Sequence, residues 1–432
     1  MTHHQTPNVD GPAAFMAWAR ENAITMDAPI DGLKADIERL APLDEALKDK
    51  RVVFLGEEDH WVHEKAEYRM YLLRYLVSRG WHFISEELGW PDGVRTDRYI
   101  QSGQEQWLEM VATYGYKGDT RTDREDKPTG LLKDSSANYP VEAFKREQTR
   151  QARLLHQLNI ETKGKIRCFG FDIDVLAGGG YRDAAEILQP FSHTEEGRKL
   201  TALLQRVPKE TVEQEIRRLE KLLSMLKKDR KVLVKLSDEA FTLLGQHILN
   251  LVDGLEFIRV AHPAKGYGRL RKAMAEREQA MCRNTDFILS QMGPEGKLVL
   301  MGHNRHLSKD MASIKEAGGA SAGGRRTPSL GTYINNLLPG KVFSIWMLQG
   351  HGKSSQPYMQ LENTYTCKPG TLNAMLAEAG PTYLLPTASS DRRAAVLQCE
   401  TDIVGIYNTV FRTVIARQAD AIFFVDEVHP LV

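Results

Sequence analysis

The sequence has little cysteine, no net charge and no long hydrophobic run. Its four cysteines, among 432 residues, lie far apart and form no CxxC pair, which argues against a zinc ribbon or a disulfide scaffold. Lysine and arginine together number 57, as do aspartate and glutamate, so no overall positive field attracts nucleic acid or an anionic membrane. No window approaches the roughly 18 apolar residues that a membrane-spanning helix needs. We therefore expect a soluble protein with neither nucleic-acid nor membrane partners.

The start of the chain also lacks a recognisable targeting signal. MTHHQTPNVDGPAA contains no positively charged stretch followed by an apolar one, so we expect a cytoplasmic protein. What the chain does contain is 42% hydrophobic and 26% charged residues, a balance that favours folding over charge-driven disorder. A chain of this length buries a large core, usually as two domains or as one domain with an insertion.

Short apolar runs that end in glycine or acidic residues, each followed by a helical segment, predict an α/β protein. The first run, residues 51–55, leads into the polar segment GEEDH at 56–60. The helix expected next has one apolar face, formed by Ala66, Met70, Leu73 and Val77. Further strands are predicted over residues 82–85, 166–171, 297–301, 342–347 and 421–425. The alternation indicates a mostly parallel central sheet flanked by helices.

The strand signal fades between residues 182 and 289, which we predict to be a helical insertion or cap. Residues 209–230 carry apolar side chains at helical spacing among charges of both signs, as a helix packing one face on a core does. These apolar residues are Val212, Ile216, Leu219, Leu222 and Leu226. Residues 46–181 and 290–432 then form the catalytic α/β core, and residues 1–45 a helical lead.

Two polar or glycine-rich segments are predicted to be loops. Residues 116–139 are rich in glycine, aspartate and serine, which favours a long loop over the sheet. The glycines of residues 318–324 do not follow a strand, as the glycines of a dinucleotide-binding loop would.

Titratable side chains follow four of the predicted strands. Ligands of open parallel sheets bind at the carboxyl ends of the strands, because loops and helix N-termini converge there. The groups in question are Glu57 and His60, Glu86 and Glu87, Asp172 and Asp174, and His303 and His306. Carboxylates and imidazoles that share one pocket suit general acid-base catalysis or metal binding.

Several of these residues also have a structural explanation. Asp172 and Asp174 are of a type that caps helices and turns. His63 and Glu64 fall in the first turn of the predicted helix, where a carboxylate also stabilises the helix dipole. Of Glu86 and its neighbour, only one can face a pocket, because side chains alternate along a strand.

These segments resemble the erythromycin esterase family. Residues 56–64, GEEDHWVHE, followed by Arg69, are similar to the family's GExxHxxHE…R signature. The stretches 87–92, 169–172, 301–306 and 330–333 are similar to its E-x-D-W-P-D, Y-G-L-D, A-H-N-x-H and M-G-x-Y stretches, and residues 277–281 and 420–423 also correspond. The resemblance spans roughly residues 46–432 in the expected order.

The resemblance implies a hydrolase that cleaves an ester or lactone of a natural-product-like small molecule. It implies that His60 is the general base that activates water, while Glu57 orients the imidazole. Arg69 and His303 would stabilise the oxyanion, and Glu87 would position the water or hold the arginine. Candidate substrate-binding residues are His63, Glu64, Asp172, Asp174, Asn304 and His306. No GxSxG nucleophile elbow occurs, which favours attack by water over an acyl-enzyme.

The chain departs from the family pattern at Glu58 and Asp59, where the family usually has small or hydroxyl residues. The negative charges of these two side chains would raise the pKa of the His60 imidazole unless both side chains face solvent. Alternatively, they would favour binding of a divalent cation. The order His60, His63, Glu64 matches neither the HExxH nor the HxxEH zinc pattern, so we expect no required cofactor.

Two other functions stay open at this point. The same histidine and glutamate residues would serve a biosynthetic lyase, cyclase or transferase. A role in secondary metabolism and a role in antibiotic resistance would imply different substrates. The second alternative is a metal- or haem-binding protein without hydrolytic activity.

Overall fold

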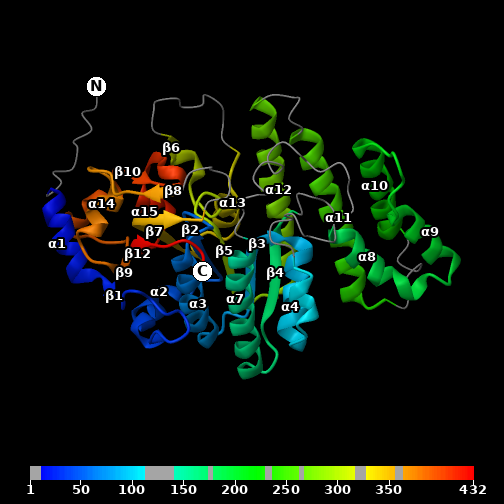
Figure 1. Ribbon diagram of the computed structural model, residues 1–432, viewed down its shortest axis with the longest axis horizontal. Helices are drawn as coiled ribbons and strands as arrows, with labels where there is room; N and C mark the ends of the chain where they lie inside the picture. The colour runs from blue at the N-terminus through cyan, green and yellow to red at the C-terminus, as the bar shows by residue number, and fades with distance from the viewer. Residues whose placement is uncertain are drawn as a thin grey trace. The chain divides into compact units, whose positions relative to one another are not determined.

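The computed structural model describes residues 11–111, 141–173, 179–228, 236–261, 267–316, 327–355 and 363–432. It shows a mixed α/β protein with a large sheet and many helices, which confirms the predicted fold class (Figure 1). Both predicted loops, 116–139 and 318–324, lie outside the described residues, as does Asp174.

The chain divides into two compact units. Unit 1 consists of Met1–Ile84, Asn138–Ile166 and Met292–Val432, and unit 2 of Ser85–Ala137 and Arg167–Gln291. In the described part of the chain, none of the helices is long and apolar enough to cross a membrane.

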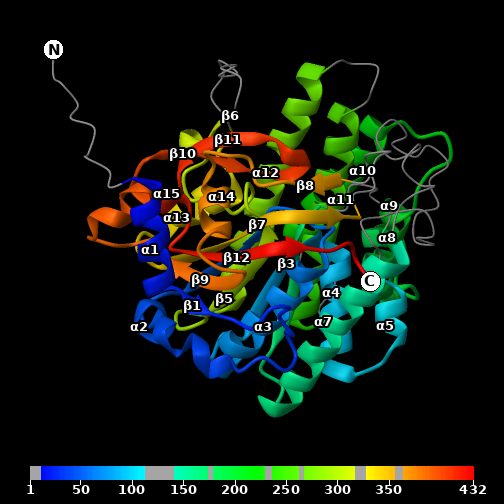
Figure 2. The same ribbon diagram turned by 60° about the vertical axis from the view of Figure 1, so that its left-hand side comes forward.

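Unit 1 contains a sheet whose strands run in the order β1-β9-β12-β7-β2-β5. Their bounds, in that order, are Ile24–Thr25, Thr382–Pro386, Ala421–Val428, Val342–Ser354, Val52–Glu57 and Leu298–His303. The pairs β12–β7, β7–β2 and β2–β5 are parallel, as predicted. Strand β9 is antiparallel to both β12 and β1, which the sequence analysis missed (Figure 2). A further strand, β8 (Asn363–Tyr365), pairs antiparallel with the end of β7.

The register of the parallel strands places two predicted site residues side by side. Glu57 and His303 are the last residues of β2 and β5, and they are paired in register. Both strands are buried along their whole length, which explains their continuous apolar sequences. Gly56 is needed beside them, because a Cβ at this position would lie 2.2 Å from Asn304 Oδ1.

The described residues of unit 1 also form helices and a second, three-stranded sheet. The helices are α1 (Pro12–Asn22), α2 (Asp44–Leu47), α3 (His63–Ser78), α7 (Val141–Glu161), α13 (Leu330–Leu337), α14 (Leu372–Ala377) and α15 (Ile415–Gln418). The 3-10 helices are η1 (Ile37–Leu43), η6 (Met311–Ser313), η7 (Arg392–Gln398) and η8 (Ile406–Asn408). The small sheet has the order β10-β11-β6, formed by Glu400–Val404, Val410–Val414 and Lys315–Glu316. Helix α3 buries the predicted apolar face, Ala66, Met70, Leu73 and Val77.

Unit 2 is mainly helical. It contains most of β3 (Phe83–Gly89), β4 (Arg167–Asp172), α4 (Trp90–Ser102), α5 (Gln106–Glu109), α8 (Gly179–Leu188), η3 (Gln189–Phe191), α9 (Glu195–Leu204), α10 (Val212–Lys228), α11 (Asp238–Ala261) and α12 (Tyr267–Gln291). Helix α10 matches the amphipathic helix predicted over 209–230, and it buries Ile216, Leu219, Leu222 and Leu226 against α8, α9 and α11. Helix α4 lies close against β4, since a Cβ on Gly93 would lie 1.7 Å from the Gly170 nitrogen.

Candidate active site

His60 lies in the short segment that joins β2 to α3, next to the end of β2. Its Nδ1 is 2.5 Å from Oε1 of Glu57, the last residue of that strand. The other oxygen of Glu57, Oε2, forms an ion pair with Arg69 on α3. The side chain of His60 is 17% exposed and that of Glu57 1%, so the imidazole is the solvent-accessible member of this pair.

The ionisation of Glu57 determines which ring nitrogen of a neutral His60 carries the hydrogen. Burial favours a raised pKa for Glu57, but the charges of Arg69 and Lys65 and the hydrogen bond from His60 outweigh burial and lower the pKa to about 2. Glu57 is therefore ionised at neutral pH and can only accept a hydrogen bond. The neutral imidazole of His60 consequently carries its hydrogen on Nδ1 and its basic lone pair on Nε2.

His303 is fixed beside His60. The centroids of the two rings are 5.6 Å apart, in an edge-on arrangement. The backbone amide of Arg305 donates to Nδ1 of His303 at 3.2 Å, and Nε2 lies 2.9 Å from the carbonyl oxygen of Glu58. Because an amide can only donate and a carbonyl only accept, these contacts select the neutral tautomer of His303 with its hydrogen on Nε2.

Two other candidates lie close to His303. Asn304 is buried and donates through Nδ2 to Glu58 Oε2 at 2.9 Å. The ring of His306 is 6.3 Å from the ring of His303. Unit 1 thus brings together Glu57, His60 and His303 with these neighbours. Glu58 and Asp59 do not face solvent, because both side chains are buried.

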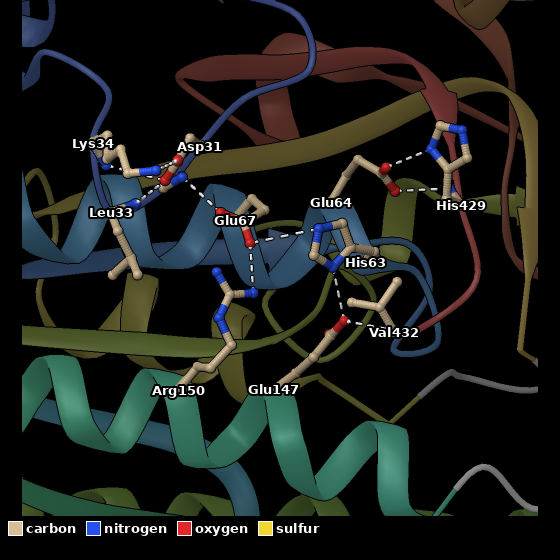
Figure 3. A network of polar contacts seen from close by, with 11 residues as sticks. Asp31, Leu33, Lys34, His63, Glu64, Glu67, Glu147, Arg150, His429 and Val432 are labelled. Carbon is tan, nitrogen blue, oxygen red and sulfur yellow. Dashed lines mark hydrogen bonds and ion pairs between the residues drawn. The ribbon is translucent and has the colours of Figure 1, made fainter.

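His63 and Glu64 take part in a polar network at the start of α3 (Figure 3). His63 Nδ1 is 2.8 Å from Oε1 of Glu147 on α7, and this hydrogen bond raises the pKa of His63 in spite of partial burial. The carboxylate of Glu64 accepts hydrogen bonds from the backbone nitrogen of His429 at 2.8 Å and from its Nδ1 at 2.7 Å. These contacts give both residues the structural role that their place in the first turn allows.

Unit 2 holds the remaining predicted residues and one that the sequence analysis did not select. Arg277, on α12, donates through Nε to Asp172 Oδ1 at 2.9 Å and through a terminal nitrogen to Glu87 Oε1 at 2.8 Å. Burial favours a lowered pKa for Arg277, but the charges of Asp172 and Glu87 outweigh burial and raise the pKa. The guanidinium therefore stays charged and binds both carboxylates. The only sequence signal for Arg277 was its place in the stretch 277–281, which resembles the family. Whether Glu87 acts with His60 stays a prediction.

The residues that the structure describes include no group of three or more His, Cys, Asp or Glu side chains placed to hold a metal ion. The carboxylate and imidazole groups of unit 1 are predictable from the sequence, but their partners are not. Tyr365, which contacts the acidic segment before His60, and Arg277 were both missed, because each reaches its partner only through the fold.

A protein-family model described as "Erythromycin esterase" matches residues 77–428, which is more than half of the chain. The matched range contains Glu87, Asp172 and His303, and it begins after Glu57 and His60.

Three solved structures share the fold. A protein of Bacillus cereus is 18% identical, with a TM-score of 0.73 and 98% of each chain covered. A structure described as a succinoglycan biosynthesis protein is 17% identical, with a TM-score of 0.70, and the match covers 97% of this chain and 98% of that one. A mutant of the erythromycin esterase EreC, in its open conformation, is 17% identical, with a TM-score of 0.63, and the match covers 91% and 95%. At these identities the likeness establishes the fold.

Proposed function

The chain belongs to the erythromycin esterase family, and on this basis we propose that it is a hydrolase that cleaves an ester or lactone of a natural-product-like small molecule. The observation that carries the proposal is the contact between Glu57 and His60. A buried, ionised carboxylate holds the imidazole at 2.5 Å and leaves Nε2 as its basic nitrogen. This arrangement suits a general base, because Glu57 also stabilises the imidazolium that forms when a proton is taken up.

In the proposed reaction, His60 Nε2 takes a proton from water while the water oxygen attacks the ester carbonyl. The tetrahedral intermediate then expels the alcohol oxygen, which receives the proton back from His60, and the products are a carboxylic acid and an alcohol. Arg69 has two proposed tasks: its ion pair keeps Glu57 ionised, and its charge stabilises the oxyanion.

The proposed roles of His303 and Glu87 come from the family resemblance. Both ring nitrogens of His303 contact backbone groups, so an oxyanion role for His303 requires one of these hydrogen bonds to open. Glu87 accepts from Arg277 within unit 2, and its role in positioning water remains a proposal from the family resemblance.

The test is hydrolysis of a panel of macrocyclic lactones, erythromycin among them, in ¹⁸O-labelled water. We expect one labelled oxygen in the acid product, and a kcat for His60→Ala that is lower by about 10²–10⁴-fold, the usual contribution of a general base. His351→Ala is the control, since the side chain of His351 in unit 1 is 49% exposed and its Nδ1 lies 3.2 Å from Asp426 Oδ1, away from Glu57 in its contacts.

Equal turnover by His60→Ala and the unchanged protein would remove His60 from the mechanism. A product without solvent oxygen would point instead to elimination or cyclisation. The same assay after dialysis against EDTA tests the further proposal that no metal is required, for which we expect unchanged turnover.

A further inference from the structure

Glu58, two residues before His60, connects three elements of unit 1. Its Oε2 accepts a 2.9 Å hydrogen bond from Nδ2 of Asn304, which follows β5, and its Oε1 accepts one of 3.1 Å from the backbone nitrogen of Ile406, the first residue of η8. Gly405 makes this contact possible, because a Cβ there would lie 2.5 Å from Glu58 Oε1. Both carboxyl oxygens therefore have a defined partner in the protein.

Asp59 is held in a similar way by a different segment. Its Oδ2 accepts a 2.5 Å hydrogen bond from the hydroxyl of Tyr365 on β8, and its Oδ1 accepts one of 2.9 Å from the backbone nitrogen of Trp61. Tyr365 is itself buried and is paired in register with Gly352 near the end of β7. The backbone on both sides of His60 is thus fixed by the side chain of Asp59.

The two segments that hold Glu58 and Asp59 are also bonded to each other. Asn408, the last residue of η8, accepts from the backbone nitrogen of Thr366 at 3.3 Å and donates to the carbonyl oxygen of Thr364, on either side of Tyr365. A path of hydrogen bonds therefore runs from Glu58 through η8 and β8 to Asp59. We call the residues of this path, Glu58, Asp59, Tyr365 and Ile406–Asn408, the carboxyl clamp.

The backbone of η8 indicates that the carboxyl clamp is more than ordinary packing. Tyr407 and Asn408 both have positive φ, 58° and 54°, in the left-handed region that residues with a Cβ adopt at a cost. Asparagine tolerates this region better than tyrosine does. Such a conformation persists only where the surrounding contacts hold it in place, and these positions tend to lie near functional sites.

We propose that Glu58 and Asp59 are positioning residues for His60. Through these two side chains, the carboxyl clamp holds the imidazole of His60 against Glu57. The effect on catalysis rests on the proposed function, but the positioning itself does not. Burial raises the pKa of Glu58 to about 7, against the hydrogen bond from Asn304, and burial also raises the pKa of Asp59.

Two substitutions weaken the carboxyl clamp without touching Glu57 or His60. Tyr365→Phe removes the hydroxyl that donates to Asp59 and keeps the ring. Asn408→Gly removes the side-chain bonds between η8 and β8, and glycine adopts the left-handed backbone without strain. Tyr75→Phe is the control, because the hydroxyl of Tyr75 donates to Asp44 Oδ1 at 2.7 Å in a second tyrosine–aspartate pair, which lies outside the clamp.

The first readout needs no substrate. A short hydrogen bond between His60 Nδ1 and an ionised carboxylate gives a far-downfield proton resonance, which is assigned by its loss in His60→Ala. We expect this resonance in the unchanged protein and in Tyr75→Phe, and we expect it shifted or broadened in Tyr365→Phe and Asn408→Gly. Its absence from the unchanged protein between pH 5 and 8, or an unaltered resonance in Tyr365→Phe, would contradict the positioning role.

The second readout is the hydrolysis of erythromycin or of whichever panel lactone is turned over. For Tyr365→Phe we expect kcat to fall about tenfold with KM within about twofold, since the clamp acts on the base and not on substrate binding. A rise in KM alone would contradict the proposal. If no lactone is hydrolysed by any of the proteins but the resonance responds as expected, the proposed function fails while the positioning role of Glu58 and Asp59 stands.

Discussion

The two oxygens of Glu57 have different partners, and this separates two contributions to the site. Oε1 accepts the hydrogen of His60 Nδ1, and Oε2 faces the guanidinium of Arg69. The first contact selects the tautomer and orientation of the imidazole, whereas the second keeps the carboxylate charged in spite of its burial. The orientation of the His60 imidazole and the negative charge beside it therefore both depend on the side chain of Glu57.

Glu57→Gln separates these contributions by keeping the shape and removing the charge. The amide oxygen can still accept from His60, but no charge stabilises the imidazolium, and the amide nitrogen faces Arg69 donor to donor. We expect kcat for lactone hydrolysis to fall by about 10²–10⁴-fold. The control is Glu45→Gln, an exposed glutamate on α2. A kcat for Glu57→Gln within threefold of the unchanged protein would show that the charge is not needed.

At the scale of elements, the start of α3 is held by the end of the chain. The helix has no side-chain cap at its N-terminus, and the backbone nitrogen of His63 donates instead to the carbonyl oxygen of His429 at 2.9 Å. The carboxylate of Glu64 in turn accepts from the backbone nitrogen and from Nδ1 of His429 (Figure 3). Val62, the residue before α3, forms a β-bridge with Pro430. Because α3 begins three residues after His60, the segment following β12 helps to set where the base lies.

Glu64→Gln tests this connection. The amide oxygen of glutamine can accept from the backbone nitrogen of His429, but the amide nitrogen then faces Nδ1 of His429, which must take its other tautomer, and the carboxylate charge is lost. We expect the free energy of unfolding to fall by about 1 kcal/mol. Urea denaturation measures this. Glu427→Gln is the matched control, because the side chain of Glu427 is 62% exposed and lies 3.8 Å from the same histidine, and we expect a change below about 0.5 kcal/mol. Equal effects of the two substitutions would mean that Glu64 does not hold the segment.

The elements that the sequence predicted share a strong local signal. Strands β2, β5 and β12 are continuous apolar runs because they are buried inside a sheet, and α10 shows a clear helical period. Strands β1, β6 and β8 have only two or three residues, too few to show a pattern. Their pairing is determined by the strands they meet, which a local reading of the sequence does not contain.

The same limit applies to the candidate site. Glu57, His60 and His303 were found because polar residues at the ends of parallel strands meet at one edge of a sheet. The tautomer of His303 was not predictable, since it depends on the carbonyl oxygen of Glu58, from a distant part of the chain. The left-handed backbone of Tyr407 has no sequence signal either, because tyrosine rarely adopts that conformation.

At the scale of the whole molecule, two adjacent buried glutamates impose opposite dependences of stability on pH. The pKa of Glu57 is lowered to about 2 from 4.5, so its contribution to stability is complete above about pH 4.5 and is lost as the pH falls towards 2. The pKa of Glu58 is raised to about 7 from 4.5 by burial, against the hydrogen bond from Asn304. Its contribution is complete below about pH 4.5 and is lost as the pH rises through 7.

Glu58→Gln isolates the second dependence, because a glutamine does not titrate while every other group is shared by the two proteins. The substitution carries its own constant cost, since the amide nitrogen must face a donor, either Asn304 or the nitrogen of Ile406. The change with pH is therefore the informative quantity. From pH 5 to pH 8 we expect the free energy of unfolding of the unchanged protein to fall, relative to that of the variant, by on the order of 3 kcal/mol. Urea denaturation at each pH measures both, and parallel curves would show that Glu58 is already ionised in the folded protein at pH 5.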